Sequence, residues 1–334
     1  MTSTPQMQKP LPQRHPAEPA RLWLRRLAWL CAIMVLLITS LSAFIRLTRS
    51  GVGCTPWPAC YGHIVDLRTT HPAPAIQAGA SDTAITLARG AHRVVASSCL
   101  LVVLALLALA LRKRWRKEAQ LAAGLLTWAL FLAFLGATAG SSRLPAVTLG
   151  HLIAGMGMWI LSLRLAWAPD PRHEVTSATP WVQPALVVAG LQIALGGLVS
   201  SGDAGLSCPV LGSCDLSAAT WQSLNPWQAI APGTNPSHAE GALVHLLHRA
   251  TGLLLLVLLS WIATQAVRQG RTTLAATLMG LALLQIALGF GAVAQQLPLL
   301  TTWAHNVGAA LLLAALVRTG IMPSKINAAT GLTG

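Results

Sequence analysis

Eight long apolar runs constrain the fold of this chain more than any other feature. An α-helix needs about 20 apolar residues to cross the hydrocarbon core of a bilayer. Charged residues make up only 10% of the 334 residues and hydrophobic residues 54%, whereas a soluble protein of this length needs far more charge to cover its surface. We therefore predict an all-α polytopic membrane protein with eight transmembrane helices. The predicted spans are 27–45, 91–111, 121–140, 147–168, 181–201, 242–266, 273–293 and 300–317.

Basic residues between the runs predict the orientation of the chain. The net charge of +14 comes from short clusters beside apolar runs, a distribution typical of cytoplasmic loops and not of a nucleic-acid-binding face. Residues 112–117 hold the densest cluster, whereas residues 202–241 contain no Lys or Arg. We predict a multi-pass protein of the bacterial inner membrane, with both termini cytoplasmic and the long loops after the first and fifth spans outside. The first of these loops departs from the rule, with Arg46, Arg49, Arg68 and Arg89.

Sequence landmarks recur at a nearly constant separation. The C-x5-C pair that begins at Cys54 recurs at Cys208, 154 residues later (208 − 54). The His-Arg pair at His92 recurs after 156 residues (248 − 92), and His151 recurs at His305 after 154 residues (305 − 151). This shared offset indicates an internal duplication.

The duplication predicts two pseudo-symmetric four-helix halves, residues 21–168 and 181–320. A cytoplasmic linker, 169–180, joins them. Residues 1–20 are polar and rich in proline and are predicted to form a disordered cytoplasmic tail, and residues 321–334 form a second cytoplasmic tail. Because each half contains an even number of spans, the repeats are parallel, with a pseudo-two-fold axis along the membrane normal.

Four histidines are candidate ligands for haem iron. Each lies near the outer end of a span that runs from outside to inside, so the four imidazoles share one depth, and two within a half can fill both axial positions of an iron. A single such histidine could equally serve helix packing, but four at repeat-equivalent positions favour a functional site. Zinc is less favoured because no acidic or cysteine ligand accompanies them within the spans. The four are His92, His151, His248 and His305, and His245 is an alternative ligand on the same face as His248.

Arg93 and Arg249 directly follow two of these histidines. A guanidinium binds a carboxylate through paired hydrogen bonds, so each arginine is a candidate partner for a haem propionate. The alternative is an arginine whose head reaches the lipid headgroups.

Two cysteine pairs, Cys54 with Cys60 and Cys208 with Cys214, fall in the predicted outer loops. That compartment is oxidising, so each pair is predicted to form a disulfide. Metal binding and a redox-active dithiol are the alternatives. Cys31 and Cys99 lie inside spans and are interpreted as packing residues.

These residues together resemble the haem A synthases. Residues 46–54, Arg-Leu-Thr-Arg-Ser-Gly-Val-Gly-Cys, followed by Trp57-Pro58 and Cys60, are similar to the first outer-loop signature of that family. The two His-Arg pairs and the two single histidines also match, and the resemblance extends from the first span to the last.

The resemblance implies an oxidoreductase that converts the C8 methyl group of haem O to a formyl group, making haem A for terminal cytochrome oxidases. It implies that the first half, with His92 and His151, holds the haem O substrate, and that the second half, with His248 and His305, holds a haem b that relays electrons. The expected partners are haem O, the haem O synthase, an unidentified electron donor and membrane lipid. Nucleic acid is not expected, and a homo-oligomer is left open.

One position departs from the family pattern. Three residues before the first histidine the family commonly has a glutamate associated with catalysis, and here that position is Arg89. Nothing in the spacing supports Asp82 or Glu240 as a substitute, so no catalytic residue is assigned. A non-enzymatic haem-binding assembly factor and a dihaem b-type electron-transfer protein are the alternative functions. A solute transporter is less favoured because the histidines lie at an outer depth and not at the midplane.

Overall fold

The computed structural model describes residues 19–49, 81–139, 142, 144–168, 180–208, 214, 216–229 and 234–320, and these ranges contain helices but no strand. Eight α-helices and two short 3-10 helices make up the described chain. They are α1 (Pro19–Arg49), α2 (Ser81–Arg112), α3 (Arg116–Ala139), α4 (Pro145–Ala166), α5 (Val182–Ser201), η1 (Ala218–Leu224), η2 (Ala239–Gly241), α6 (Ala242–Arg268), α7 (Thr272–Ala294) and α8 (Leu299–Thr319).

All eight α-helices are long and apolar enough to cross a membrane. The predicted fold class, an all-α polytopic membrane protein with eight spans, is therefore confirmed. Large apolar side chains face outward along the helices, including Val187 at 73% and Phe290 at 76% exposure. Such a surface suits lipid, which solvates apolar side chains while each helix satisfies its own backbone hydrogen bonds.

The helices at the start of the chain extend beyond the apolar runs that predicted them. Pro19 and Ala20, predicted as the end of a disordered tail, form the first turn of α1, where proline's fixed φ suits a helix start. Asp82 and Arg89, predicted in the first outer loop, lie in α2. An apolar run marks only the part of a helix that lies in hydrocarbon, whereas the backbone hydrogen bonds continue into the polar flanks. Residues 1–18, 169–179 and 321–334 of the predicted tails and linker lie outside the described residues.

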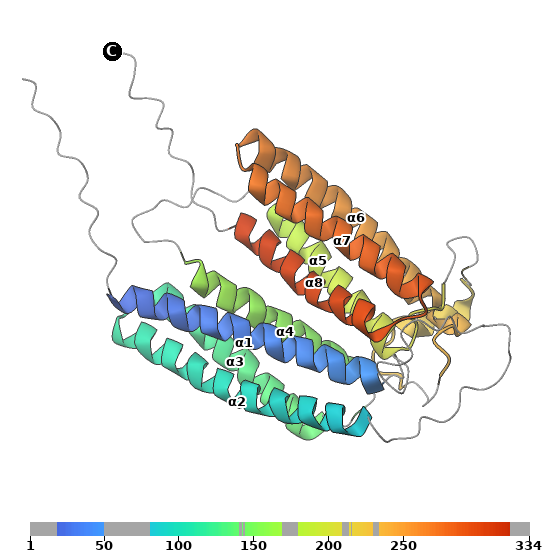
Figure 1. Cartoon of the computed structure of the whole chain (residues 1–334), viewed down its shortest axis with the longest axis horizontal. Helices are drawn as coiled ribbons and strands as arrows, with labels where there is room; N and C mark the ends of the chain where they lie inside the picture. Colours follow the sequence, from blue (N-terminus) through green and yellow to red (C-terminus); the bar gives the residue numbers. More distant parts are fainter. Residues whose placement is uncertain are drawn as a thin grey trace, which may run out of the picture.

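Helices α1 to α4 form one bundle and α5 to α8 a second bundle beside it (Figure 1). Within the first bundle, α1 and α3 each contact both α2 and α4. Between the bundles, α1 contacts α8, α4 contacts α5, and α4 contacts α8. If the two halves are exchanged, α1 takes the place of α5, and α4 takes the place of α8. The α1–α8 contact then becomes the α5–α4 contact, and the α4–α8 contact stays the same. This is the pattern expected for halves related by a two-fold axis.

Hydrogen bonds cross the seam between the bundles. The indole Nε1 of Trp159 on α4 donates to the carbonyl oxygen of Ala310 on α8 at 2.8 Å. The indole Nε1 of Trp303 on α8 donates to the carbonyl oxygen of Ser40 on α1 at 3.1 Å. Helix α8 is therefore fixed against two helices of the other half.

The loops that follow α5 gather at one end of the molecule, opposite the end where α1 begins and α8 finishes (Figure 1). The backbone N–H of Ala146, at the start of α4, donates to the carbonyl oxygen of Pro226 in this region at 2.7 Å. The segment between α5 and α6 thus reaches across to the first half.

Candidate functional site

The histidine pair of the second half has a spacing that fits one metal ion between two imidazoles. His248 on α6 and His305 on α8 have ring centroids 6.4 Å apart, with ring planes at 73°. Bonds from imidazole nitrogen to a metal are about 2.0–2.1 Å, so two rings on opposite sides of one iron have centroids roughly 6 Å apart. The observed separation is therefore compatible with one iron between the two rings.

His248 is held by a residue of the neighbouring helix α5. Its Nδ1 lies 3.2 Å from the backbone carbonyl oxygen of Gln192, and its Nε2 lies 3.4 Å from the side-chain amide nitrogen of the same glutamine. A ring nitrogen that donates to a carbonyl fixes the tautomer and orientation, and leaves the other nitrogen for a metal. Nε2 is therefore the candidate ligand atom of His248.

Glycines on α5 and α7 make room for the two rings. A Cβ placed on Gly196 would lie 2.9 Å from Cε1 of His248, and a Cβ on Gly289 would lie 3.2 Å from Cε1 of His305. Any side chain at either position would occupy space that the imidazole fills. The absence of a side chain there is what allows both rings to lie close to the neighbouring helix.

The same five residues, Gln-Ile-Ala-Leu-Gly, build both surroundings. They occur at 192–196 in α5 and at 285–289 in α7. In each copy the glycine lies against the histidine of the next helix. The glutamine amide lies against a second glycine, about one turn after that histidine, which is Gly252 on α6 and Gly308 on α8. We refer to these two copies as the histidine cradles. Sequence analysis missed them, although an exact five-residue repeat 93 residues apart (285 − 192) was available as a signal.

Among the described residues, the histidines of the first half have fewer contacts of this kind. The Nδ1 of His151 on α4 lies 2.9 Å from the carbonyl oxygen of Val147, one turn earlier in the same helix. A Cβ on Gly136 of α3 would lie 3.8 Å from its Nε2. His92 on α2 is half-buried and interacts electrostatically with His151. The structure thus brings His92 and His151 toward one interior, and Gly136 corresponds to Gly289 (289 − 136 = 153).

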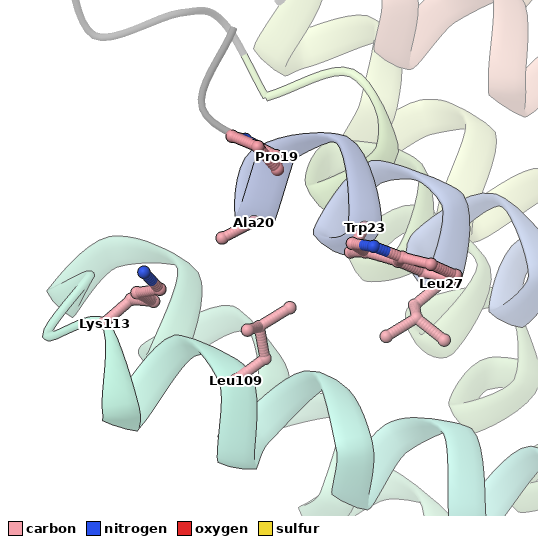
Figure 2. A pocket seen from close by; sticks show the side chains of 6 residues that line it. All are labelled: Pro19, Ala20, Trp23, Leu27, Leu109 and Lys113. Atoms are coloured by element: carbon pink, nitrogen blue, oxygen red, sulfur yellow. The ribbon is translucent and has the colours of Figure 1, made fainter.

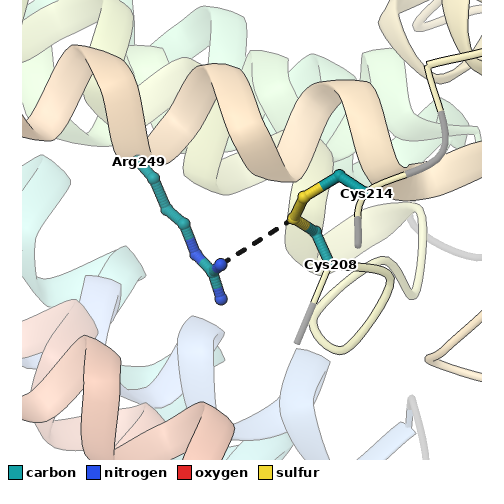
Figure 3. The surroundings of a disulfide bond; sticks show 3 residues. All are labelled: Cys208, Cys214 and Arg249. Atoms are coloured by element: carbon teal, nitrogen blue, oxygen red, sulfur yellow. Dashed lines mark hydrogen bonds between the residues drawn. A yellow bond between two sulfur atoms is a disulfide. The ribbon is translucent and has the colours of Figure 1, made fainter. Parts of the chain in front are cut away.

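The predicted disulfide of the second half is present. Cys208 and Cys214 are bonded, with Cα atoms 4.9 Å apart, while Cys54 and Cys60 lie outside the described residues. The guanidinium of Arg249 approaches this bond, its Nη1 lying 3.8 Å from Sγ of Cys208 (Figure 3). Arg249 therefore connects α6, one residue after His248, to the segment that follows α5.

The other predicted residues lie at the edge of these sites. Arg93 and Arg89 are exposed on α2, and Glu240 is exposed in η2. His245 is buried at 4% exposure, near the backbone of Ala204 in the loop that follows α5. Cys31 and Cys99 are buried with their sulfur atoms 3.9 Å apart, as free thiols in the first-half core.

Sequence reasoning also missed a contact between the halves beside His305. The Nη2 of Arg46 on α1 donates to Oδ1 of Asn306 at 3.0 Å, and the amide of Asn306 donates to the carbonyl of Thr302 at 2.8 Å. The residue after His305 is thus bonded to the first half. The only signal for this contact in the sequence was that Arg46 lies in a predicted outer loop, where the positive-inside rule disfavours a basic residue.

Within the described ranges, no group of three or more His, Cys, Asp or Glu side chains gathers to hold a metal ion. A metal that arrives inside its own macrocycle needs only two axial ligands, which is the number of histidine ligands predicted for each half. These features define a polytopic helical membrane protein with two repeat-related histidine pairs.

Comparison with known proteins places the chain within a family. The family described as "Cytochrome oxidase assembly protein" matches residues 25–317, and the chain belongs to it. A protein named heme A synthase from Shewanella oneidensis is 32% identical over 323 residues, covering 88% of this chain and 94% of that protein. The resemblance drawn from the outer-loop signature and the histidines is thereby confirmed.

Proposed function

We propose that this chain is a haem A synthase, a membrane oxidoreductase that oxidises the C8 methyl group of haem O to a formyl group for cytochrome oxidase biogenesis. The observation that carries the proposal is the His248–His305 pair, whose centroid separation of 6.4 Å fits one iron. Family membership and the relative of Shewanella oneidensis support it.

The second half is the proposed site of haem b. His248, through Nε2, and His305 would hold the iron, while the Gln192 carbonyl orients the first ring and Gly196 and Gly289 leave room for both rings. A haem with both axial positions filled supplies one-electron transfer and does not bind oxygen. The protein's part is to fix the two rings, which both histidine cradles do.

The first half is the proposed site of the haem O substrate, with His92 and His151 as its ligands. Within the described residues, one glycine of a neighbouring helix, Gly136, faces a histidine of this site, and Leu132 stands four residues before it where α7 has a glutamine. A site with fewer fixed contacts around its ligands suits a substrate that must enter and leave.

Arg249 and Arg93 are proposed to bind the propionates at the outer edge of each site. Support comes from the place of Arg249, between His248 and the Cys208–Cys214 disulfide. In this arrangement the disulfide holds the outer loop near the guanidinium. A carboxylate at that position would accept charge-assisted hydrogen bonds.

We further place both termini in the bacterial cytoplasm and the Cys208–Cys214 loop outside. The basic cluster at 112–117 and the absence of Lys and Arg from 202–241 support this orientation. Haem O would then reach the first half from the haem O synthase, and electrons would enter the second half from a donor still to be identified.

Pigment extraction and chromatography of membranes from a host that makes haem O test the proposal. Haem A is expected to appear with the intact chain, and to disappear with His92→Ala. Arg268→Gln, an exposed position on α6 far from both sites, is the matched control and should leave haem A unchanged.

Binding of haem b without any haem A, given a competent electron donor, would contradict the proposal. That result would favour a non-enzymatic assembly factor, the function to which Arg89 in place of the family glutamate points. Because Arg89 lies on α2 one turn before His92, Arg89→Glu is an informative companion. We expect it to retain haem binding at His92 and His151.

A further inference from the structure

An open groove lies between the first turns of α1 and the end of α2, far from the histidines. It has a volume of about 560 Å³ and is lined by Pro19, Ala20, Trp23, Leu27, Leu109 and Lys113 (Figure 2). Five of these residues are apolar and come from both helices. The sixth, Lys113, lies just beyond the last residue of α2. We refer to this feature as the α1–α2 groove.

The groove crosses the boundary between hydrocarbon and headgroups. The span of α1 covers 30 residues, which at 1.5 Å per residue is about 45 Å, whereas the hydrocarbon core is about 30 Å thick. The first turns of α1 therefore lie among the headgroups, and Leu27 and Leu109 lie closer to the acyl chains. Trp23, 58% exposed, stands between these two levels, where tryptophan is enriched in membrane proteins.

Two cations lie beside the groove. Lys113 forms part of its wall, and the guanidinium carbon of Arg26 lies 5.5 Å from the centre of the Trp23 ring. Arg21 belongs to a different contact, because it forms an ion pair with Glu118 at 3.2 Å and stacks on Trp115. Arg21 is therefore engaged with Glu118 and Trp115, whereas Lys113 and Arg26 lie beside the groove.

We propose that the α1–α2 groove binds one anionic phospholipid, with its phosphate near Lys113 and Arg26 and an acyl chain along Leu27 and Leu109. The apolar lining favours a lipid over a free anion, and basic pockets between transmembrane helices bind anionic headgroups in this way. The equivalent position in the second half is Gln269, 156 residues after Lys113 (269 − 113), so this cation is particular to the first half. The proposal is independent of haem binding.

Native mass spectrometry of the purified full-length chain tests this site. The protein is incubated with equal amounts of phosphatidylglycerol and phosphatidylcholine that carry the same acyl chains. We expect the phosphatidylglycerol adduct to dominate, and Lys113→Gln or Arg26→Gln to lower its ratio to phosphatidylcholine about fivefold each. Arg268→Gln, the equivalent of Arg112 in the second half, is the control and should leave the ratio unchanged.

Two further measurements make the outcome decisive. Leu109→Trp fills the groove and should reduce retention of both lipids while the charge stays the same, and inorganic phosphate should not displace the lipid. Equal retention of the two lipids by the unmodified chain, or an unchanged ratio in both Lys113→Gln and Arg26→Gln, would overturn the proposal. Displacement by inorganic phosphate would overturn it as well, since it would reveal a simple anion site.

Discussion

At the scale of single residues, the histidine sites depend on glycines as much as on histidines. Gly196, Gly289 and Gly136 each lie against the imidazole of a histidine on a neighbouring helix. A helix normally disfavours glycine by about 1 kcal/mol relative to alanine. At Gly196 and Gly289 the lost helix propensity is offset because the imidazole lies where a side chain would crowd it.

Gly196→Ala is expected to reduce haem binding in the second half. The new Cβ would lie 2.9 Å from Cε1 of His248, closer than carbon atoms pack, so the imidazole must shift from its present position. The measurement is the haem-to-protein ratio with the low-spin absorbance spectrum of the purified protein, and we expect a several-fold loss of low-spin haem. Gly190→Ala, on the same helix with nothing within 4 Å, is the control. Equal spectra for the two variants would show that Gly196 has no part in placing His248.

His248→Ala and His245→Ala separate the predicted ligand from its alternative. His248 is 6.4 Å from His305 between ring centroids, whereas His245 lies near Ala204 in the outer loop. We expect His248→Ala to abolish the bis-histidine haem spectrum and His245→Ala to keep it. The reverse result would make His245 the ligand. Absorbance and electron paramagnetic resonance of each variant provide the measurement.

The histidines could be predicted from sequence and their surroundings could not. A histidine in an apolar run is costly and conspicuous, and comparison of the halves at an offset near 154 pairs all four. The cradle residues Gln192 and Gln285 both lie in the second half, so a comparison of the first half with the second does not align them with each other. Glycine and glutamine also carry no signal of their own in a membrane helix until the neighbouring helix is placed.

At the scale of elements, the sequence predicted the helices well and their ends poorly. Eight apolar runs of spanning length leave little choice but eight helices, as observed. The starts of α1 and α2 could not be read from hydropathy because their first turns lie outside hydrocarbon. Which helices touch could not be read either, since the apolar character is spread around each helix and does not mark one face.

The outer loop of the second half is stabilised by its disulfide. We expect the double change Cys208→Ser and Cys214→Ser to lower the free energy of unfolding by about 2 kcal/mol, the loop-entropy value for a bridge of this short span. Thermal unfolding of the purified protein in detergent measures it. Haem content should stay near that of the intact chain, because neither sulfur is a ligand in the proposed site. Full stability together with a complete loss of haem A formation in cells would instead indicate a redox-active pair.

At the scale of the whole molecule, the two halves form one unit through α8. This helix carries His305 and contacts α1 and α4 of the first half. Its Trp303 donates a hydrogen bond to α1, and it accepts a hydrogen bond from Trp159 on α4. The pseudo-two-fold relation does not make the two sides of the seam alike. On the α4–α5 side, Leu149 and Leu152 pack against Gly197, whereas the α1–α8 side holds the polar contact of Arg46 with Asn306.

This polar contact is expected to couple the stability of the seam to the second-half site. Asn306→Leu removes the oxygen that accepts from the Arg46 guanidinium at 3.0 Å, and a hydrogen bond to a charged group contributes about 1.5–3 kcal/mol. We expect a lower thermal midpoint and a shifted haem reduction potential, because Asn306 is adjacent to His305. Thr264→Val is the matched control, since it removes an exposed hydroxyl bonded only within its own helix. A potential unchanged in Asn306→Leu, with a lower thermal midpoint, would limit the contact to a structural role between the halves.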